Sequence, residues 1–260
     1  MRLSGLVDSH CHLQHERFDP DRDAVLERAV EAGIERIMVP GWDLPSSEAA
    51  LELAERHAPL IQAAVGVHPH DAAQADERTW HDLEGLAADP RCSAVGEIGL
   101  DFFRNLSPPD VQRSAFERQL KLAAERDLPV LVHDRDAHEE VTAALLQWPG
   151  RAARAVRGVL HAFSGDPGMG EALTARGLLV SFALPLSFRS AVGARAAAIA
   201  VPAETYLLET DAPYLGPERD GRNEPTTTLR VAVELGRLRG MQPQAVADDV
   251  RQAYERLVAA

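Results

Sequence analysis

The sequence predicts an α/β protein, a (β/α)8 barrel of the TIM type, on two observations. Short apolar runs alternate with amphipathic stretches about eight times along the chain, and this alternation is typical of strand–helix units around a parallel sheet. The chain has 260 residues, a length at which eight such units close into one barrel. We therefore expect a single barrel domain over residues 1–260.

The individual elements follow from the positions of these runs. We expect strands at 5–9, 36–39, 61–67, 93–98, 129–132, 157–160, 178–181 and 206–209, because each run is short and apolar, as in a strand buried on both faces. Helices are expected at 22–31, 46–56, 78–87, 108–126, 137–147 and 168–175, with an alanine-rich candidate at 186–200. Two more helices, 226–238 and 243–257, end the chain, and the second is an extra C-terminal helix beyond the eighth unit.

Composition and charge narrow the class of protein. An apolar share of 45% with 26% charged residues is ordinary for a globular protein. The first residues resemble neither a signal peptide nor a membrane span, so we expect a cytoplasmic protein with no membrane contact, and no obligate protein partner is evident. The net charge of −13 counts against broad capture of nucleic acid. It does not exclude a nucleic-acid enzyme, because bound divalent cations reverse the field inside a pocket lined by carboxylates.

Polar side chains follow most of the predicted strands. Six of the eight strands end in His, Glu or Asp, namely His10 with His12, His68 with His70, Glu97, His133, His161, and Glu209 with Asp211. Parallel strands of a barrel end at one rim, so these side chains should converge there. One such histidine alone would be an ordinary core residue. The whole set predicts a metal centre, whereas His15, His57, His81 and His138 lack such partners and are expected at the surface.

The ligand types indicate the chemistry of that centre. Imidazole and carboxylate groups suit Zn²⁺, Mn²⁺ or Fe²⁺, and Mg²⁺ is also a candidate. Two such ions about 3.5–4 Å apart activate a water molecule, and Glu97 is placed to bridge them. Alternatively, Glu97 serves as an outer group in a one-metal enzyme. Asp211 is the candidate proton acceptor, and each ligating imidazole should bind an acceptor through its other nitrogen.

A carboxylated lysine is another way to bridge two metal ions. The chain contains one lysine, Lys121, in the predicted helix 108–126. Helices form the outer ring of such a barrel, so Lys121 should not reach the strand ends. This reasoning leaves Glu97 as the expected bridge.

Several of these motifs together resemble a known family. They are, in chain order, DSHCHL at 8–13, GVHPH at 66–70, GEIGLDFFR at 96–104, HDRDA at 133–137, HAFSG at 161–165, ETDAPYL at 209–215 and RNEP at 222–225. In these segments, which span nearly the whole chain, the sequence resembles the TatD family of metal-dependent deoxyribonucleases, within the amidohydrolase-like barrels.

The resemblance implies a metal-dependent hydrolase with a definite assignment of ligands. Glu97 would bridge two ions, His10, His12 and Asp211 would complete one site, and His133 and His161 the other. His68 would lie near the reacting phosphate. The family further implies DNA hydrolysis, often by 3′-to-5′ exonuclease action, with roles in DNA repair and apoptotic DNA degradation. The expected partner is therefore DNA, taken at 3′ ends and as single strands.

The substrate contacts and the function itself have alternatives. Arg104, Arg135 and Arg222 fall in loops at the expected rim, where they would hold phosphates or, for at least one of them, form a surface salt bridge. His70 and Asn223 are further candidates, and Glu209 either contacts substrate or orients a metal ligand. Competing functions are a small-molecule amidohydrolase or esterase on the same metals, and a metal-binding protein without catalysis.

Overall fold

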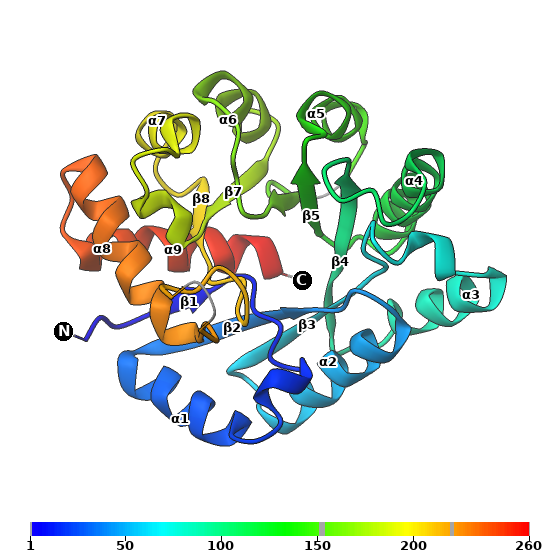
Figure 1. Ribbon diagram of the computed structural model, residues 1–260, viewed down its shortest axis with the longest axis horizontal. Coiled ribbons are helices and arrows are strands. Elements are labelled where there is room, and N and C mark those ends of the chain that lie inside the picture. Colours follow the sequence, from blue (N-terminus) through cyan, green and yellow to red (C-terminus); the bar gives the residue numbers. More distant parts are fainter. Residues whose placement is uncertain (1, 151–153, 219–220, 260) are drawn as a thin grey trace.

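The centre of the molecule is an eight-stranded parallel sheet whose strands neighbour one another in chain order (Figure 1). The computed structural model describes residues 2–150, 154–218 and 221–259. The strands are β1 (Leu6–Asp8), β2 (Ile34–Pro40), β3 (Ile61–Val65), β4 (Cys92–Asp101), β5 (Val130–Arg135), β6 (Gly158–Leu160), β7 (Leu178–Phe182) and β8 (Tyr206–Leu208). Their apolar side chains are almost all buried, as the continuous apolar runs predict.

The first and last strands meet and bring the sheet close to a full barrel. The backbone N–H of Ser9 donates to the carbonyl of Leu208 at 2.9 Å. Beside it, Thr210 donates its N–H and its hydroxyl to the two carboxyl oxygens of Asp8, at 2.9 and 2.6 Å. Asp8 is fully buried, and this burial raises its pKa to about 8. The predicted (β/α)8 barrel is confirmed. The strands that precede the candidate metal-binding residues all end at one rim of this barrel.

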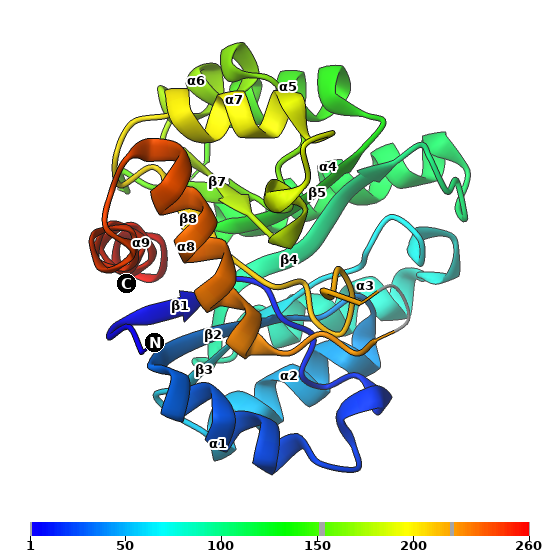
Figure 2. The same ribbon diagram turned by 60° about the vertical axis from the view of Figure 1, so that its left-hand side comes forward.

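Helices cover the outside of the barrel (Figures 1 and 2). They are α1 (Arg22–Ala32), α2 (Leu44–Arg56), α3 (Glu77–Leu86), α4 (Pro109–Glu125), α5 (His138–Gln147), α6 (Pro167–Thr174), α7 (Val192–Ala200), α8 (Thr228–Arg239) and α9 (Pro243–Val258). The extra C-terminal helix, α9, packs on β1 and β8. The part of the chain that the structure describes contains no helix long and apolar enough to cross a membrane.

Two elements differ most from their predicted bounds. The helix expected at 186–200 begins only at Val192, because a 3-10 turn, Leu184–Ser187, and an irregular stretch precede it. Strand β4 continues past residue 98 to Asp101, paired with β5. Gly99 permits this continuation, since its φ is +139° and a Cβ there would lie 2.0 Å from the carbonyl oxygen of His133. The longer strand places Asp101 at the rim.

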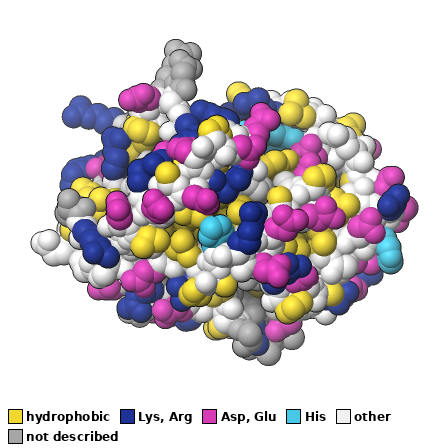
Figure 3. All heavy atoms as spheres, turned by 90° about the horizontal axis from the view of Figure 1, so that it is seen from below, with side chains coloured by type: hydrophobic (Ala, Val, Ile, Leu, Met, Phe, Trp, Pro, Cys, Tyr) yellow, Lys and Arg dark blue, Asp and Glu magenta, His cyan; other side chains and the backbone are white. Residues whose placement is uncertain are grey.

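Charges of both signs are mixed on the face seen from below. Figure 3 shows acidic and basic side chains interleaved there, with apolar groups between them. Elsewhere on the surface, ion pairs such as Arg28 with Glu224 and Arg91 with Asp89 join charges of opposite sign. This face therefore offers no broad basic surface for a polyanion, as expected from the net charge of −13.

The contact between Asp8 and Thr210 allows a test of barrel closure. Replacing Thr210 by Val keeps the shape but removes the buried hydroxyl donor, so the free energy of unfolding should fall by about 1–3 kcal/mol. Urea unfolding of the metal-free protein measures this loss. Thr226→Val is the matched control, because Thr226 is partly exposed, and it should stay within about 0.5 kcal/mol of the parent. Equal stability of the two variants would show that closure of the barrel between β1 and β8 does not depend on the hydrogen bond from the Thr210 hydroxyl to Asp8.

Candidate metal centre

The carboxylate of Glu97 lies at the centre of the rim. Glu97 belongs to β4 and is only 3% exposed. Side chains from the ends of β1, β3, β5, β6 and β8 surround it, so the strand ends converge as the sequence predicts. The two carboxylate oxygens face different groups of neighbours, which are described in turn.

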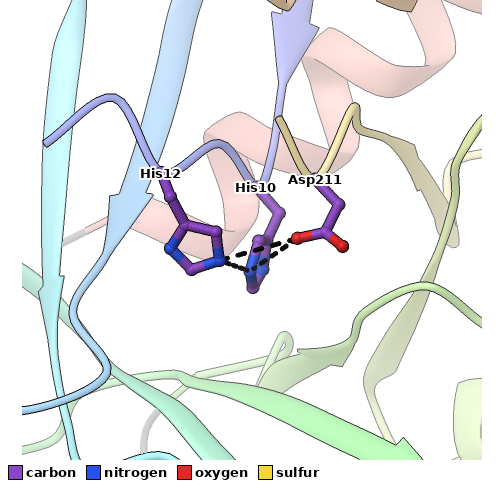
Figure 4. A group of neighbouring side chains, drawn as sticks. All are labelled: His10, His12 and Asp211. Atoms are coloured by element: carbon purple, nitrogen blue, oxygen red, sulfur yellow. Dashed lines mark hydrogen bonds and ion pairs between the residues drawn. The ribbon is translucent and has the colours of Figure 1, made fainter. Parts of the chain in front are cut away.

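One oxygen of Glu97 faces the residues that follow β1 and β8. Its Oε2 lies 3.2 Å from Nε2 of His10 and 3.5 Å from Nε2 of His12. Asp211 completes this group, with its Oδ1 3.5 Å from Nε2 of His12 and 3.9 Å from Nε2 of His10. Figure 4 shows the two imidazoles and the carboxylate pointing toward one another. We call this set of His10, His12, Asp211 and Oε2 the first group.

The other oxygen of Glu97 faces the histidines of three further strand ends. Its Oε1 lies 2.8 Å from Nε2 of His161 and 2.9 Å from Nδ1 of His133. His68 approaches the same oxygen through Nε2 at 3.4 Å. This is the second group. The family resemblance implies that His68 lies near the reacting phosphate. In the structure its Nε2 also approaches Oε1 of Glu97, only slightly farther away than the nitrogens of His161 and His133.

These donor sets fit divalent cations. Ligand atoms about 2.1 Å from one ion lie about 3.0–3.4 Å apart in octahedral or tetrahedral coordination, and the separations in the two groups run from 2.8 to 3.9 Å around that range. Nε2 of His10 and Nε2 of His12 are 3.3 Å apart, and Nδ1 of His133 and Nε2 of His161 are 3.1 Å apart. A proton or a cation is needed between two such nitrogens, because two lone pairs repel at this distance. The described residues thus contain three overlapping sets able to hold a metal ion.

The field of the imidazoles acts on both carboxylates. Burial by itself would raise the pKa of Glu97, but interaction with the imidazoles of His161, His68 and His10 brings it well below its ordinary value. Burial likewise opposes ionisation of Asp211, while its bond to His12 and the nearby imidazoles lower its pKa. Burial lowers the pKa of His68 to about 4, so this imidazole is neutral at neutral pH. Ionised carboxylates and neutral imidazoles are the forms that bind metal ions. Burial alone would lower the pKa of His12 and His161, but the carboxylates around them raise the pKa of both imidazoles, so metal binding there would release protons.

Most of the ligating imidazoles also have a neighbour at their second nitrogen. Nδ1 of His12 lies 3.2 Å from the carbonyl of Pro40, and Nε2 of His133 lies 3.3 Å from Oδ2 of Asp101. Nδ1 of His161 lies 3.5 Å from Oε1 of Glu209. The expectation of a hydrogen-bonded acceptor for every imidazole is wrong at His10 and His161, whose Nδ1 atoms are buried without a hydrogen bond to any described residue. The rings of His10 and His161 stack on each other, with centroids 4.0 Å apart.

Asp101 is a functional candidate that the sequence reasoning did not assign. It is fully buried and also contacts Nε2 of His70 at 2.7 Å. Asp101 therefore contacts both His133 and His70, and the ring of His70 also lies 4.3 Å from the ring of His68. A signal for this role was present, since Glu97 and Asp101 are four residues apart and side chains at that spacing share one face of a strand.

The remaining predicted substrate residues have different environments. Glu209 is fully buried, accepts a hydrogen bond from the hydroxyl of Ser181 and lies beside His161, which favours the alternative that it orients a candidate metal ligand. Arg222 donates to the carboxylates of Asp21 and Glu224, so for this arginine the structure agrees with a salt bridge, the alternative to phosphate binding. Asn223 is buried and donates to the carbonyl of Thr210. The exposed side chains of Arg104 and Arg135 have no ion pair with any described residue.

The fold and the site together define a class of protein. A TIM-type barrel that gathers imidazoles and carboxylates at the carboxyl ends of its strands is the arrangement of the metal-dependent barrel hydrolases. Comparison with known proteins identifies the branch of this class. Residues 7–259 match the family described as TatD related DNase. The chain belongs to this family and is a hydrolase.

Individual relatives are similar over their whole length. A Bacillus subtilis protein described as the uncharacterized metal-dependent hydrolase YabD is 35% identical, with 97% of this chain and 98% of that protein covered. The 3'-5' ssDNA/RNA exonuclease TatD of Edwardsiella piscicida is 39% identical, with 96% and 99% covered. The crystal structure of YjjV, a TatD homolog of Escherichia coli, superposes with a TM-score of 0.91 at 29% identity, with 98% of each chain covered.

The position of Asp101 leads to a prediction about metal affinity. Asp101→Asn keeps the size of the side chain but removes the charge that orients His133, so the affinity for Mn²⁺ or Zn²⁺ should fall by about 10–100-fold. Isothermal titration of metal into the chelator-treated protein measures this. Asp110→Asn, at an exposed position in the first turn of α4, is the control and should bind as the parent does. An unchanged metal affinity in Asp101→Asn would show that Asp101 does not position His133 for metal binding.

Proposed function

We propose that this protein is a metal-dependent nuclease that hydrolyses phosphodiester bonds of DNA, from 3′ ends and on single strands. The observation that carries the proposal is Glu97, whose two oxygens face two separate groups of metal-binding side chains. Membership of the TatD related DNase family supports the choice of substrate. So does the name of the Edwardsiella relative, which is an exonuclease of single-stranded DNA and RNA.

Two divalent cations are part of this proposal, one in each group. His10, His12 and Asp211 would hold the first, His133 and His161 the second, with Glu97 shared between them. Such cations neutralise phosphate charge and make a water molecule more acidic. Their identity among Mg²⁺, Mn²⁺ and Zn²⁺ is open to experiment, because carboxylate and imidazole ligands accept all three.

The protein side chains supply proton transfer and positioning. Asp211 has a carboxylate that is ionised at neutral pH and 16% exposed, so it can accept the proton of an attacking water molecule. His68 is neutral and can donate a hydrogen bond to a phosphate oxygen beside the second group. Arg104 and Arg135 can donate to phosphates farther along the strand, because no carboxylate pairs with either among the described residues.

The first test of this function is cleavage itself. The purified protein should release nucleotides from a 3′-labelled single strand with Mg²⁺ or Mn²⁺, and a chelator should stop the release. Asp211→Asn keeps the volume and loses the basic group, so turnover should fall by about 100-fold or more. A panel of amides and carboxylic esters is assayed in parallel. Turnover of that panel without cleavage of any DNA would favour the small-molecule hydrolase instead.

The second test concerns the bridge. Glu97→Ala leaves two cations facing each other with no anion between them, so at least one should be lost. Metal analysis after equilibrium dialysis should give a lower metal content for this variant. Lys121→Arg is the control, because Lys121 is 77% exposed on α4 and lies 3.7 Å from Glu125. It should keep the metal content and an activity independent of bicarbonate. Unchanged metal content and affinity in Glu97→Ala would rule out the bridge.

A further inference from the structure

Many of the exposed apolar side chains lie in segments that follow strands of the barrel. Most of the large apolar side chains that are exposed in the described residues follow β4, β7 or β8, and these are Phe103, Leu106, Phe188, Val192, Tyr214 and Leu215. Loops after the strands of a barrel form the mouth of the site. Apolar groups clustered at one place on a surface mark a binding site for an apolar partner.

The first aromatic platform lies beside the second group of metal-binding residues. Phe103 is 61% exposed and lies two residues after Asp101, which contacts His133. The guanidinium carbon of Arg135 is 4.1 Å from the centre of the Phe103 ring, and Arg135 lies two residues after His133. We call Phe103 and Arg135 the β4 platform. An arginine stacked on a phenylalanine holds the ring in place while much of it stays open to solvent.

The second aromatic platform lies beside the first group. The Tyr214 ring is 6.2 Å from the ring of His12 and is 48% exposed. His15 lies against Tyr214 at 5.8 Å and against Trp42 at 6.0 Å. Sequence reasoning left His15 as a plain surface residue, but it joins these two rings. We call Tyr214, His15 and Trp42 the β8 platform.

The metal-binding residues thus have an aromatic platform on each side. We propose that the two platforms stack the unpaired bases that flank the scissile phosphate, and that they are the source of a preference for single strands. This inference rests on the proposed nuclease function. Nucleobases fit these surfaces because every base has a flat face that stacks on aromatic rings and on guanidinium groups. Stacking of this kind tolerates any base sequence.

The same contacts disfavour duplex ends. In a duplex each base is paired and stacked on its neighbours, so its faces become available only after the end has opened. A strand that is already unpaired can stack on the two platforms without any such opening. On a duplex end, the same stacking must first offset the loss of base pairing. A single strand should therefore bind more tightly than a blunt duplex of the same sequence.

The platforms can be tested by removing each ring and each base. On a single strand with normal 3′-terminal nucleotides, Phe103→Ala and Tyr214→Ala should raise KM about 10-fold. On a strand whose two 3′-terminal nucleotides are abasic, the wild type should already show the raised KM, and neither variant should raise it further. Phe103→Tyr and Tyr214→Phe retain the rings and should behave as the wild type does. Val30→Ala removes an exposed apolar side chain of α1 and is the distant control.

A binding measurement separates this inference from the proposed function. A strand with 2-aminopurine at its 3′ end loses fluorescence when that base stacks, and this can be followed on the chelator-treated protein without cleavage. Quenching by the wild type that is lost in Phe103→Ala or Tyr214→Ala supports the platforms, even if no DNA is cut. Cleavage of DNA with the same KM in wild type, Phe103→Ala and Tyr214→Ala would overturn them and leave the nuclease intact. A dimer that dissociates in either variant would assign the apolar rim to self-association and overturn the inference.

Discussion

Glu97 imposes the main electrostatic constraint on this barrel, because its carboxylate is almost completely buried among the imidazoles of five histidines. A buried charge is costly unless opposite charge or hydrogen bonds compensate for it. In this protein the imidazoles that compensate the charge of Glu97 follow strands that are far apart in the sequence. These strands must therefore end at the same level along the barrel axis. The strand bodies below the rim are mostly apolar, and the candidate metal-binding side chains are confined to one layer.

The same constraint explains what could be predicted from the sequence. His10, Glu97, His133 and Asp211 were placed correctly at one rim, because parallel strands in a barrel must end together. Their division between the two oxygens of Glu97 followed from the family resemblance, and the geometry agrees with it. Distances between side-chain atoms, in contrast, depend on rotamers, so nothing in the sequence indicated that Nε2 of His68 lies 3.4 Å from Oε1 of Glu97.

What the sequence did not predict depends on contacts between distant loops. Arg222 and Arg104 are both arginines in rim loops, yet only Arg222 has carboxylate partners, one of them Asp21 some two hundred residues earlier. No periodicity in the sequence contains that information. The extent of β4 was also missed, because the left-handed backbone of Gly99 lets the strand continue where the apolar run stops. Asp101 owes its contact with His133 to this extension.

The seam between β1 and β8 is continuous with the first group of metal-binding residues. Asp8 and Thr210 form the seam, and the next ligands along each segment, His10 and Asp211, also share a backbone hydrogen bond of 2.9 Å. A cation held by both side chains would act as a cross-link that closes a loop of about two hundred residues. Because such a cation would bind the folded barrel and be released from the unfolded chain, it would stabilise the folded state by mass action. Metal supply would then govern how long the barrel survives unfolding and proteolysis, as well as its activity.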